Sequence, residues 1–249
     1  MKHIKHFLLL LLFLAQAFIY ANSQIRVACL GNSITFGSGL DNRSTESYPS
    51  QLKQLLGINY EVRNYGVPGT TMLKDNSTDD EADQEHWSYW EPHEHSKDVG
   101  GLEEFQKALA WEPNIVIIKF GTNDARGAIW PSTANDGRNN FFKTYVEFID
   151  AFKALPTKPT IYICYPIPFY KLERSADREQ ARVIREEVIP LVKQIALHAD
   201  VKLIDLHSLF VNKDVDQYYL TNENDYVHPN AAGAALIAQE VYKTIIMNE

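Results

Sequence analysis

Five short runs of apolar and β-branched residues, separated by longer segments, constrain the fold of this chain more than any other feature. Several of them are apolar at nearly every position, which is typical of strands covered on both faces of a sheet. The runs are IRVACL (25–30), YEVRNYG (60–66), NIVIIKFG (114–121), TIYICYP (160–166) and VKLIDL (201–206).

Segments with helical periodicity alternate with these runs. Apolar residues recur at helical spacing in 49–56, 142–152, 184–195 and 231–246, and Pro190 is expected to kink the third of these helices. Strands that alternate with helices imply right-handed crossovers and a parallel sheet. The 249 residues, 45% of them hydrophobic, suit one α/β domain. In such folds ligands bind beyond the carboxyl ends of the strands.

The first 23 residues differ from the rest of the chain. Lys2 and Lys5 precede the apolar stretch FLLLLLFLA, and Ala21-Asn22-Ser23 resembles a cleavage site. Gln16 interrupts an apolar run that is already short for a membrane span. We therefore expect a signal peptide over residues 1–23, a single domain over residues 24–249, a secreted or periplasmic location and no stable membrane insertion after its removal.

Charge and composition exclude several classes of function. The net charge of −8 argues against nucleic acid as a partner, because phosphate binding needs clustered positive charge. Cys29 and Cys164 lie inside strand-like runs and are expected to be buried free thiols. His86 and the stretch HEHSKD (93–98) have no diagnostic metal-ligand spacing, so no metal or other cofactor is expected.

Ser33 stands where the first predicted strand ends, in the sequence Gly31-Asn32-Ser33. Its hydroxyl can cap the following helix, or it can act as a nucleophile if a base removes its proton. Asp225 and His228 offer such a base with a carboxylate to orient it, because one tight turn can bring the two side chains together. Taken alone, they are better explained as a polar loop in which Asn230 caps the last helix, whereas together with Ser33 they favour a catalytic base.

Acyl transfer also needs hydrogen-bond donors for the developing oxyanion. Asn123, after the third predicted strand, can present a side-chain amide, and Gly69, after the second, can expose a backbone N–H. Taken singly, both residue types are common in turns.

These blocks together resemble the SGNH, or GDSL-type, hydrolase family. The resemblance spans Ile25 to the C-terminus. It implies a three-layer α/β/α, flavodoxin-like fold with a five-stranded parallel sheet, and a serine-dependent carboxylic ester hydrolase. It also implies Ser33 as nucleophile, His228 and Asp225 as its catalytic partners, and an oxyanion hole of Ser33, Gly69 and Asn123. Asn32 departs from the usual aspartate of the first block, which predicts altered local hydrogen bonding rather than inactivity.

The substrate is indicated only by residues 72–101. Trp87, Tyr89 and Trp90 stand there among acids and histidines, a composition that suits a sugar ring better than a long acyl chain. Alternatively, these aromatic rings anchor the segment to the protein body. The stretches ESYPSQLKQLLG (46–57) and HPNAAGAALIAQEVY (228–242) resemble those of secreted bacterial proteins classed as sialate O-acetylesterase-like. We therefore predict an O-acetylesterase acting on a glycan or small carbohydrate ester. The alternatives are a lipid acylhydrolase or thioesterase, and a non-catalytic glycan-binding module.

Overall fold

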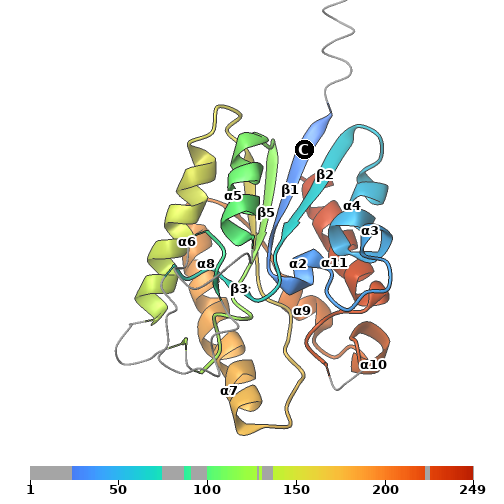
Figure 1. The fold of residues 1–249 in the computed structure, drawn as a ribbon, viewed down its shortest axis with the longest axis vertical. Helices are drawn as coiled ribbons and strands as arrows, with labels where there is room; N and C mark the ends of the chain where they lie inside the picture. Colours follow the sequence, from blue (N-terminus) through green and yellow to red (C-terminus); the bar gives the residue numbers. More distant parts are fainter. Residues whose placement is uncertain are drawn as a thin grey trace, which may run out of the picture.

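The computed structural model describes residues 24–74, 87–90, 100–127, 129–130, 137–221 and 225–248. Its centre is a parallel sheet of five strands in the order β2-β1-β5-β6-β7 (Figure 1). Counted along the chain within this sheet, that order is 2-1-3-4-5, the flavodoxin-like arrangement. The strands are β1 (Ile25–Gly31), β2 (Tyr60–Gly66), β5 (Ile115–Lys119), β6 (Thr160–Cys164) and β7 (Lys202–Ile204). Each of the five predicted runs is therefore a strand, and the predicted fold class is confirmed.

Helices cover both faces of the sheet, which makes the three layers visible in Figure 1. One face packs against α4 (Tyr48–Leu56), α9 (Leu206–Phe210) and α11 (Ala231–Ile246). The other packs against α5 (Gly101–Ala110), α6 (Gly137–Lys153), α7 (Ser175–Val183) and α8 (Ile189–His198). The short helices α2 (Ser33–Phe36), α3 (Arg43–Glu46) and α10 (Val215–Tyr218) lie in connections. Burial on both faces explains why the strands are so uniformly apolar.

Helix α11 shows how local sequence sets an element. Asn230 accepts hydrogen bonds at its side chain from the N–H groups of Ala232 and Gly233, both at 3.0 Å, and so caps the helix N-terminus. Ile237, Val241 and Ile245 then bury one face against the sheet. The last helix therefore starts next to the predicted catalytic loop.

Three features differ from the sequence-based expectations. Helix α5 was not predicted, and neither was the pair of short parallel strands β3 (Thr70–Thr71), just before the segment 72–101, and β4 (Trp87–Ser88), within it. Around Pro190 the structure has a π-helical turn, η2 (Ile184–Val188), between α7 and α8. Proline donates no N–H and crowds the carbonyl four residues earlier, and a wider turn accommodates both effects.

Cys29 and Cys164 are buried free thiols, as predicted. The predicted signal peptide, residues 1–23, lies outside the described residues, as do His86 and residues 93–98. Within the described part of the chain, no helix combines the length and the apolar character needed to cross a bilayer.

Candidate active site

The carboxyl ends of the strands surround a pocket of about 510 Å³. Its lining includes five of the residues that the sequence singled out: Ser33, Gly69, Asn123, Asp225 and His228. They come from segments after β1, β2 and β5 and from the loop before α11. The topology therefore brings together residues that lie up to 195 positions apart in the sequence.

Ser33 is the first residue of α2, immediately after β1. The turn is tight, because Gly31 and Gly66 leave no room for a side chain. A Cβ atom on Gly31 would lie 2.6 Å from the Lys119 carbonyl oxygen, and one on Gly66 would lie 2.2 Å from the Phe36 backbone nitrogen. The two glycines thus let α2 pack directly on the strand ends, which places Ser33 in the lining of the pocket.

A continuous hydrogen-bonded chain joins serine, histidine and aspartate. His228 Nε2 lies 2.8 Å from Ser33 Oγ. On the other side of the ring, Nδ1 lies 2.8 Å from Asp225 Oδ2 and 3.0 Å from Oδ1. The single tight turn expected between Asp225 and His228 is present, and backbone bonds from Tyr226 N–H to Leu220 O (2.9 Å) and from Tyr170 N–H to Tyr226 O (3.1 Å) hold it.

The Asp225 carboxylate is kept ionised by its surroundings. Burial, the largest single influence, tends to raise the pKa of Asp225. The hydrogen bonds from the His228 ring and from the N–H groups of Val227 and His228 outweigh it, so the pKa lies below its usual value. An ionised Asp225 fixes a hydrogen on Nδ1 and leaves Nε2 as the acceptor that faces Ser33.

Three potential oxyanion donors converge near Ser33. The Ser33 N–H is at the start of α2, where N–H groups have no acceptor within the helix. Gly69 has a φ of 76°, a conformation that suits glycine, and it lines the pocket beside Asn123. Asn123 Nδ2 donates to the Thr70 carbonyl at 2.9 Å, which fixes the amide plane and leaves its second hydrogen for another acceptor.

Asp124 was not assigned a role from sequence, although it directly follows Asn123. Its Oδ1 accepts hydrogen bonds from the N–H groups of Met72 (2.8 Å) and Leu73 (3.1 Å), and its Oδ2 accepts one from Gly121 (3.0 Å). Burial raises the pKa of Asp124 to about 6, although these backbone donors lower it. The residue ties the segment after Gly69 to the turn that carries Asn123.

Sequence reasoning also missed the charged wall of the pocket. Arg126, Lys171, Arg174 and Asp177 line it, together with Ser38 and Gln180. Its only large apolar side chains among the described lining residues are those of Pro68, Phe169 and Val227. The three cations lie in loops or at the start of a helix, and none is part of a recognisable motif. Only their positions after predicted strands could have indicated that they line the pocket.

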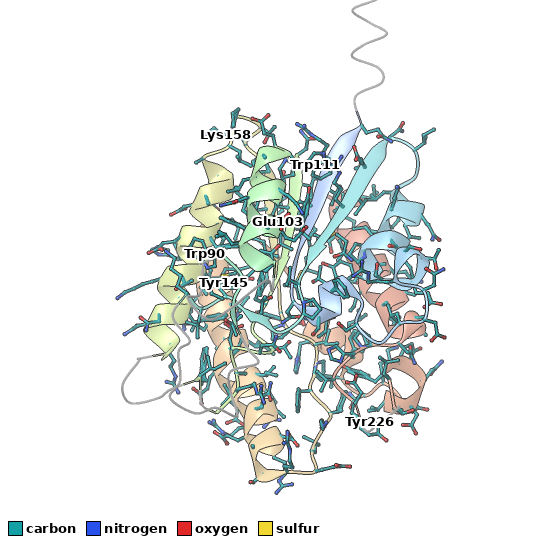
Figure 2. The ribbon with its side chains drawn as sticks, in the orientation of Figure 1. Trp90, Glu103, Trp111, Tyr145, Lys158 and Tyr226 are labelled. Atoms are coloured by element: carbon teal, nitrogen blue, oxygen red, sulfur yellow. The ribbon has the colours of Figure 1, made fainter. Side chains whose placement is uncertain are left out.

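The prediction that Tyr89 and Trp90 contact substrate is wrong: Tyr89 is a core residue, and Trp90 is partly buried and packs against the core. Tyr89 is fully buried, donates to the Tyr65 carbonyl at 2.5 Å and stacks edge-on against Phe120. Trp90 packs against Phe148, donates to the Met72 carbonyl at 3.0 Å and, in Figure 2, lies beside α5 and α6. Neither lines the pocket, so for these two rings the anchoring interpretation holds. The side chain of Trp87 is outside the described structure.

Asn32 is fully buried and caps α2, with Oδ1 3.4 Å from the Ile34 N–H. Its Nδ2 finds no hydrogen-bond partner among the described residues. Asn32 thus leaves one buried donor unsatisfied within the described part of the chain, and Ser33 next to it is hydrogen-bonded to His228.

The sequence pattern of the GDSL-like lipase/acylhydrolase family matches residues 29–236. An acetylxylan esterase from Xylanibacter ruminicola is 32% identical over 240 residues. That match covers 89% of this chain and 43% of the esterase, so the chain spans less than half the length of this relative.

Solved structures share the fold at lower sequence identity. A carbohydrate acetylesterase family member from Sinorhizobium meliloti superposes with a TM-score of 0.60 at 20% identity, covering 90% of this chain and 98% of that one. A two-domain esterase active on acetylated mannans gives a TM-score of 0.56 at 20% identity, over 95% of this chain and 53% of that one.

Proposed function

The chain belongs to the GDSL-like lipase/acylhydrolase family, and on that premise we propose that it is a serine esterase that removes O-acetyl groups from carbohydrates. The observation that carries the proposal is the hydrogen-bonded chain from Ser33 through His228 to Asp225, at the mouth of a predominantly polar pocket.

In the first half of the reaction, Ser33 Oγ attacks the acetyl carbonyl carbon while His228 Nε2 takes the hydroxyl proton. The carbonyl oxygen becomes an oxyanion and accepts hydrogen bonds from the N–H groups of Ser33 and Gly69 and from Asn123 Nδ2. His228 then passes the proton to the sugar oxygen, the C–O bond breaks, and the acetyl group stays on Ser33.

In the second half, His228 takes a proton from water, and the resulting hydroxide attacks the acetyl-enzyme. Collapse of the second tetrahedral intermediate returns the proton to Ser33 Oγ and releases acetate. Asp225 remains a carboxylate throughout and stabilises the imidazolium that forms twice. No step requires a metal or another cofactor.

The lining of the pocket supports a carbohydrate ester. A long acyl chain needs a continuous apolar wall, whereas the large apolar side chains named above are three among many polar ones. Hydroxyl-rich sugars match the amide and charged groups of Asn123, Gln180 and Arg126. The acetylxylan esterase and the carbohydrate acetylesterase described above act on the same kind of bond, as their names state.

The deciding experiment compares acetate release from acetylated oligosaccharides with cleavage of p-nitrophenyl esters of increasing chain length. We expect activity on the saccharides and on the acetyl ester, declining as the acyl chain lengthens. Preference for long chains would favour a lipid acylhydrolase or thioesterase instead.

The Ser33→Ala variant tests the nucleophile itself. It should lose turnover by a factor of about 10³ or more, because it removes the hydroxyl that lies 2.8 Å from His228 Nε2. Its thermal unfolding should match that of the wild type, since Ser33 is a small residue that adds little to the core. Labelling of the wild type, but not the variant, by a fluorophosphonate provides an independent readout, and an unlabelled folded wild type would favour a non-catalytic glycan-binding module.

We also propose that residues 1–23 direct export and are removed. Recovery of the protein outside the cytoplasm with Gln24 as its first residue supports this, and a retained Met1 in the exported protein contradicts it.

A further inference from the structure

One wall of the pocket carries positive charge in a protein whose net charge is −8. Arg126, Lys171 and Arg174 contribute three cations, and among the described residues of this wall Asp177 is the one carboxylate. The other acid of the pocket, Asp225, is engaged by His228. Surplus positive charge beside a reacting centre favours a substrate that carries negative charge.

Arg174 and Asp177 form a fixed pair at the start of α7. Arg174 Nε and Nη2 donate to the two carboxylate oxygens of Asp177 at 2.9 and 2.8 Å. These bonds lower the pKa of Asp177, and the positive charge of Lys171 adds to the effect. Asp177 is buried whereas the Arg174 side chain is 68% exposed, so the pair neutralises Asp177 and presents the guanidinium edge outward.

Lys171 is the cation of this wall that the protein leaves available. Among the described residues, its ammonium group has no hydrogen-bond or ion-pair partner. The backbone on both sides is nevertheless held in place: Tyr170 N–H donates to the Tyr226 carbonyl at 3.1 Å, and Arg178 Nη1 donates to the carbonyls of Leu172 (2.8 Å) and Glu173 (2.9 Å).

The bond between Tyr170 and Tyr226 links this cation to the catalytic loop. Tyr226 lies between Asp225 and His228 in sequence, so the backbone that carries Lys171 is fixed to the backbone that carries the base. Such fixed positions reduce the conformational freedom lost when a ligand is bound. The backbone of Lys171 is therefore held beside the catalytic loop, and its side chain lines the same pocket as Ser33.

We infer that the pocket selects acetylated saccharides that carry a carboxylate, with Lys171 as the principal specificity residue and Arg126 and Arg174 beside it. This inference rests on the proposed function and narrows its substrate class. The carboxylate would be that of a uronic acid or of a sialic acid, which present the same charged group on different sugar frames.

The test compares two acetylated xylooligosaccharides that differ in one group, a glucuronic acid branch or the same branch with its carboxyl reduced to an alcohol. The wild type should show a kcat/KM about fivefold to tenfold higher on the acidic form, as expected for a charge-assisted hydrogen bond. The preference should shrink as salt is added, because the charges are partly exposed. Acetylated sialic acid, run in parallel, separates the two sources of carboxylate.

The Lys171→Gln variant should lose most of this preference, mainly through a higher KM on the acidic form. Lys158→Gln removes the same charge at the opposite end of the molecule, where Figure 2 places Lys158 far from Tyr226, and should behave as the wild type. Equal kcat/KM on both forms in the wild type, or an unchanged preference in Lys171→Gln, would overturn the inference while leaving the esterase proposal intact.

The charge selectivity can also be measured as binding, without acetate release. Calorimetric titration of Ser33→Ala with the two non-acetylated oligosaccharides should show tighter binding of the acidic one. Loss of acetate release from every substrate would count against the proposed function, and equal binding of the two oligosaccharides would count against the charge selectivity.

Discussion

At the scale of single residues, Asn123 has two tasks in one amide group. One hydrogen holds the Thr70 carbonyl at 2.9 Å, and the other is left to bind the oxyanion. Replacing Asn123 with alanine removes a donor that stabilises the transition state, so kcat should fall by about a hundredfold or more. Steady-state kinetics with p-nitrophenyl acetate measures this effect.

Asn248→Ala is the matched control for Asn123→Ala, because it removes an amide that donates to the Thr244 carbonyl at the end of α11 and does not line the pocket. It should leave kcat unchanged. An unchanged kcat in Asn123→Ala would exclude that residue from the oxyanion hole.

Asp124 acts on the same site without touching the substrate, so it is a positioning residue. An asparagine at position 124 has one acceptor oxygen, and its other terminal atom is an NH₂ donor. That NH₂ group would face either the Gly121 N–H or the N–H groups of Met72 and Leu73, so donor would oppose donor. The segments that carry Gly69 and Asn123 should then shift apart. We expect Asp124→Asn to lower kcat by about tenfold to a hundredfold with KM nearly unchanged.

A purely structural role for Asp124 would give a different result. The folded fraction of Asp124→Asn would fall, but the kcat and KM of the molecules that remain folded would equal those of the wild type. Active-site titration with a fluorophosphonate counts the competent molecules and separates the two outcomes.

At the scale of elements, strand β5 contains a buried lysine, Lys119, within the core. Lys119 is fully buried, and its ammonium group has no hydrogen-bond partner within the described part of the chain. Burial lowers its pKa to about 8 from the usual 10.5. Because the folded state holds this proton less tightly than the unfolded state, Lys119 destabilises the fold below pH 8, and stability is regained as pH rises from 8 to 10.5.

Lys119→Met should therefore raise the free energy of unfolding at pH 7, by about 3 kcal/mol at most. The gain over the wild type should shrink between pH 8 and 10.5, and urea denaturation at several pH values measures it. A constant difference between the two proteins across this range would mean that Lys119 does not titrate as described.

The same scale shows what sequence patterns can and cannot predict. The five strands followed from β-branched runs, because burial on both faces leaves a strong local pattern. Helix α5 was missed although Leu102, Phe105 and Leu109 have helical spacing, since its start at Gly101 adjoins an irregular segment. The aromatic residues 89 and 90 were misplaced because composition alone does not distinguish a ring that binds sugar from one that packs in the core.

The site residues also divide into those that the sequence could predict and those that it could not. Ser33, Asp225 and His228 were predictable because each stands in a short motif at a strand or helix end, and the structure brings them together. Lys171 and Arg174 were not, because no local pattern marks a cation that becomes relevant only when two loops meet.

At the scale of the whole molecule, the two thiols report on global unfolding. Cys29 and Cys164 are fully buried on the same face of the sheet, and burial raises the pKa of both, that of Cys164 to about 12. Since the thiolate is the reactive form, neither thiol should react with DTNB in the native protein. Both should react at once in roughly 6 M guanidinium, which unfolds most domains of this size.

The native labelling rate should follow the unfolding rate and should slow in a stabilised variant such as Lys119→Met. Rapid modification of one thiol in the folded protein would reveal local opening of the sheet and contradict this prediction.

The proposed nucleophile follows the first strand, and its base precedes the last helix. During synthesis, an emerging chain would thus hold a chemically inert serine until the final helix docks. No separate inhibitor is then needed before folding is complete. During refolding, the appearance of turnover reports the time at which the segment after β1 and the loop before α11 come together.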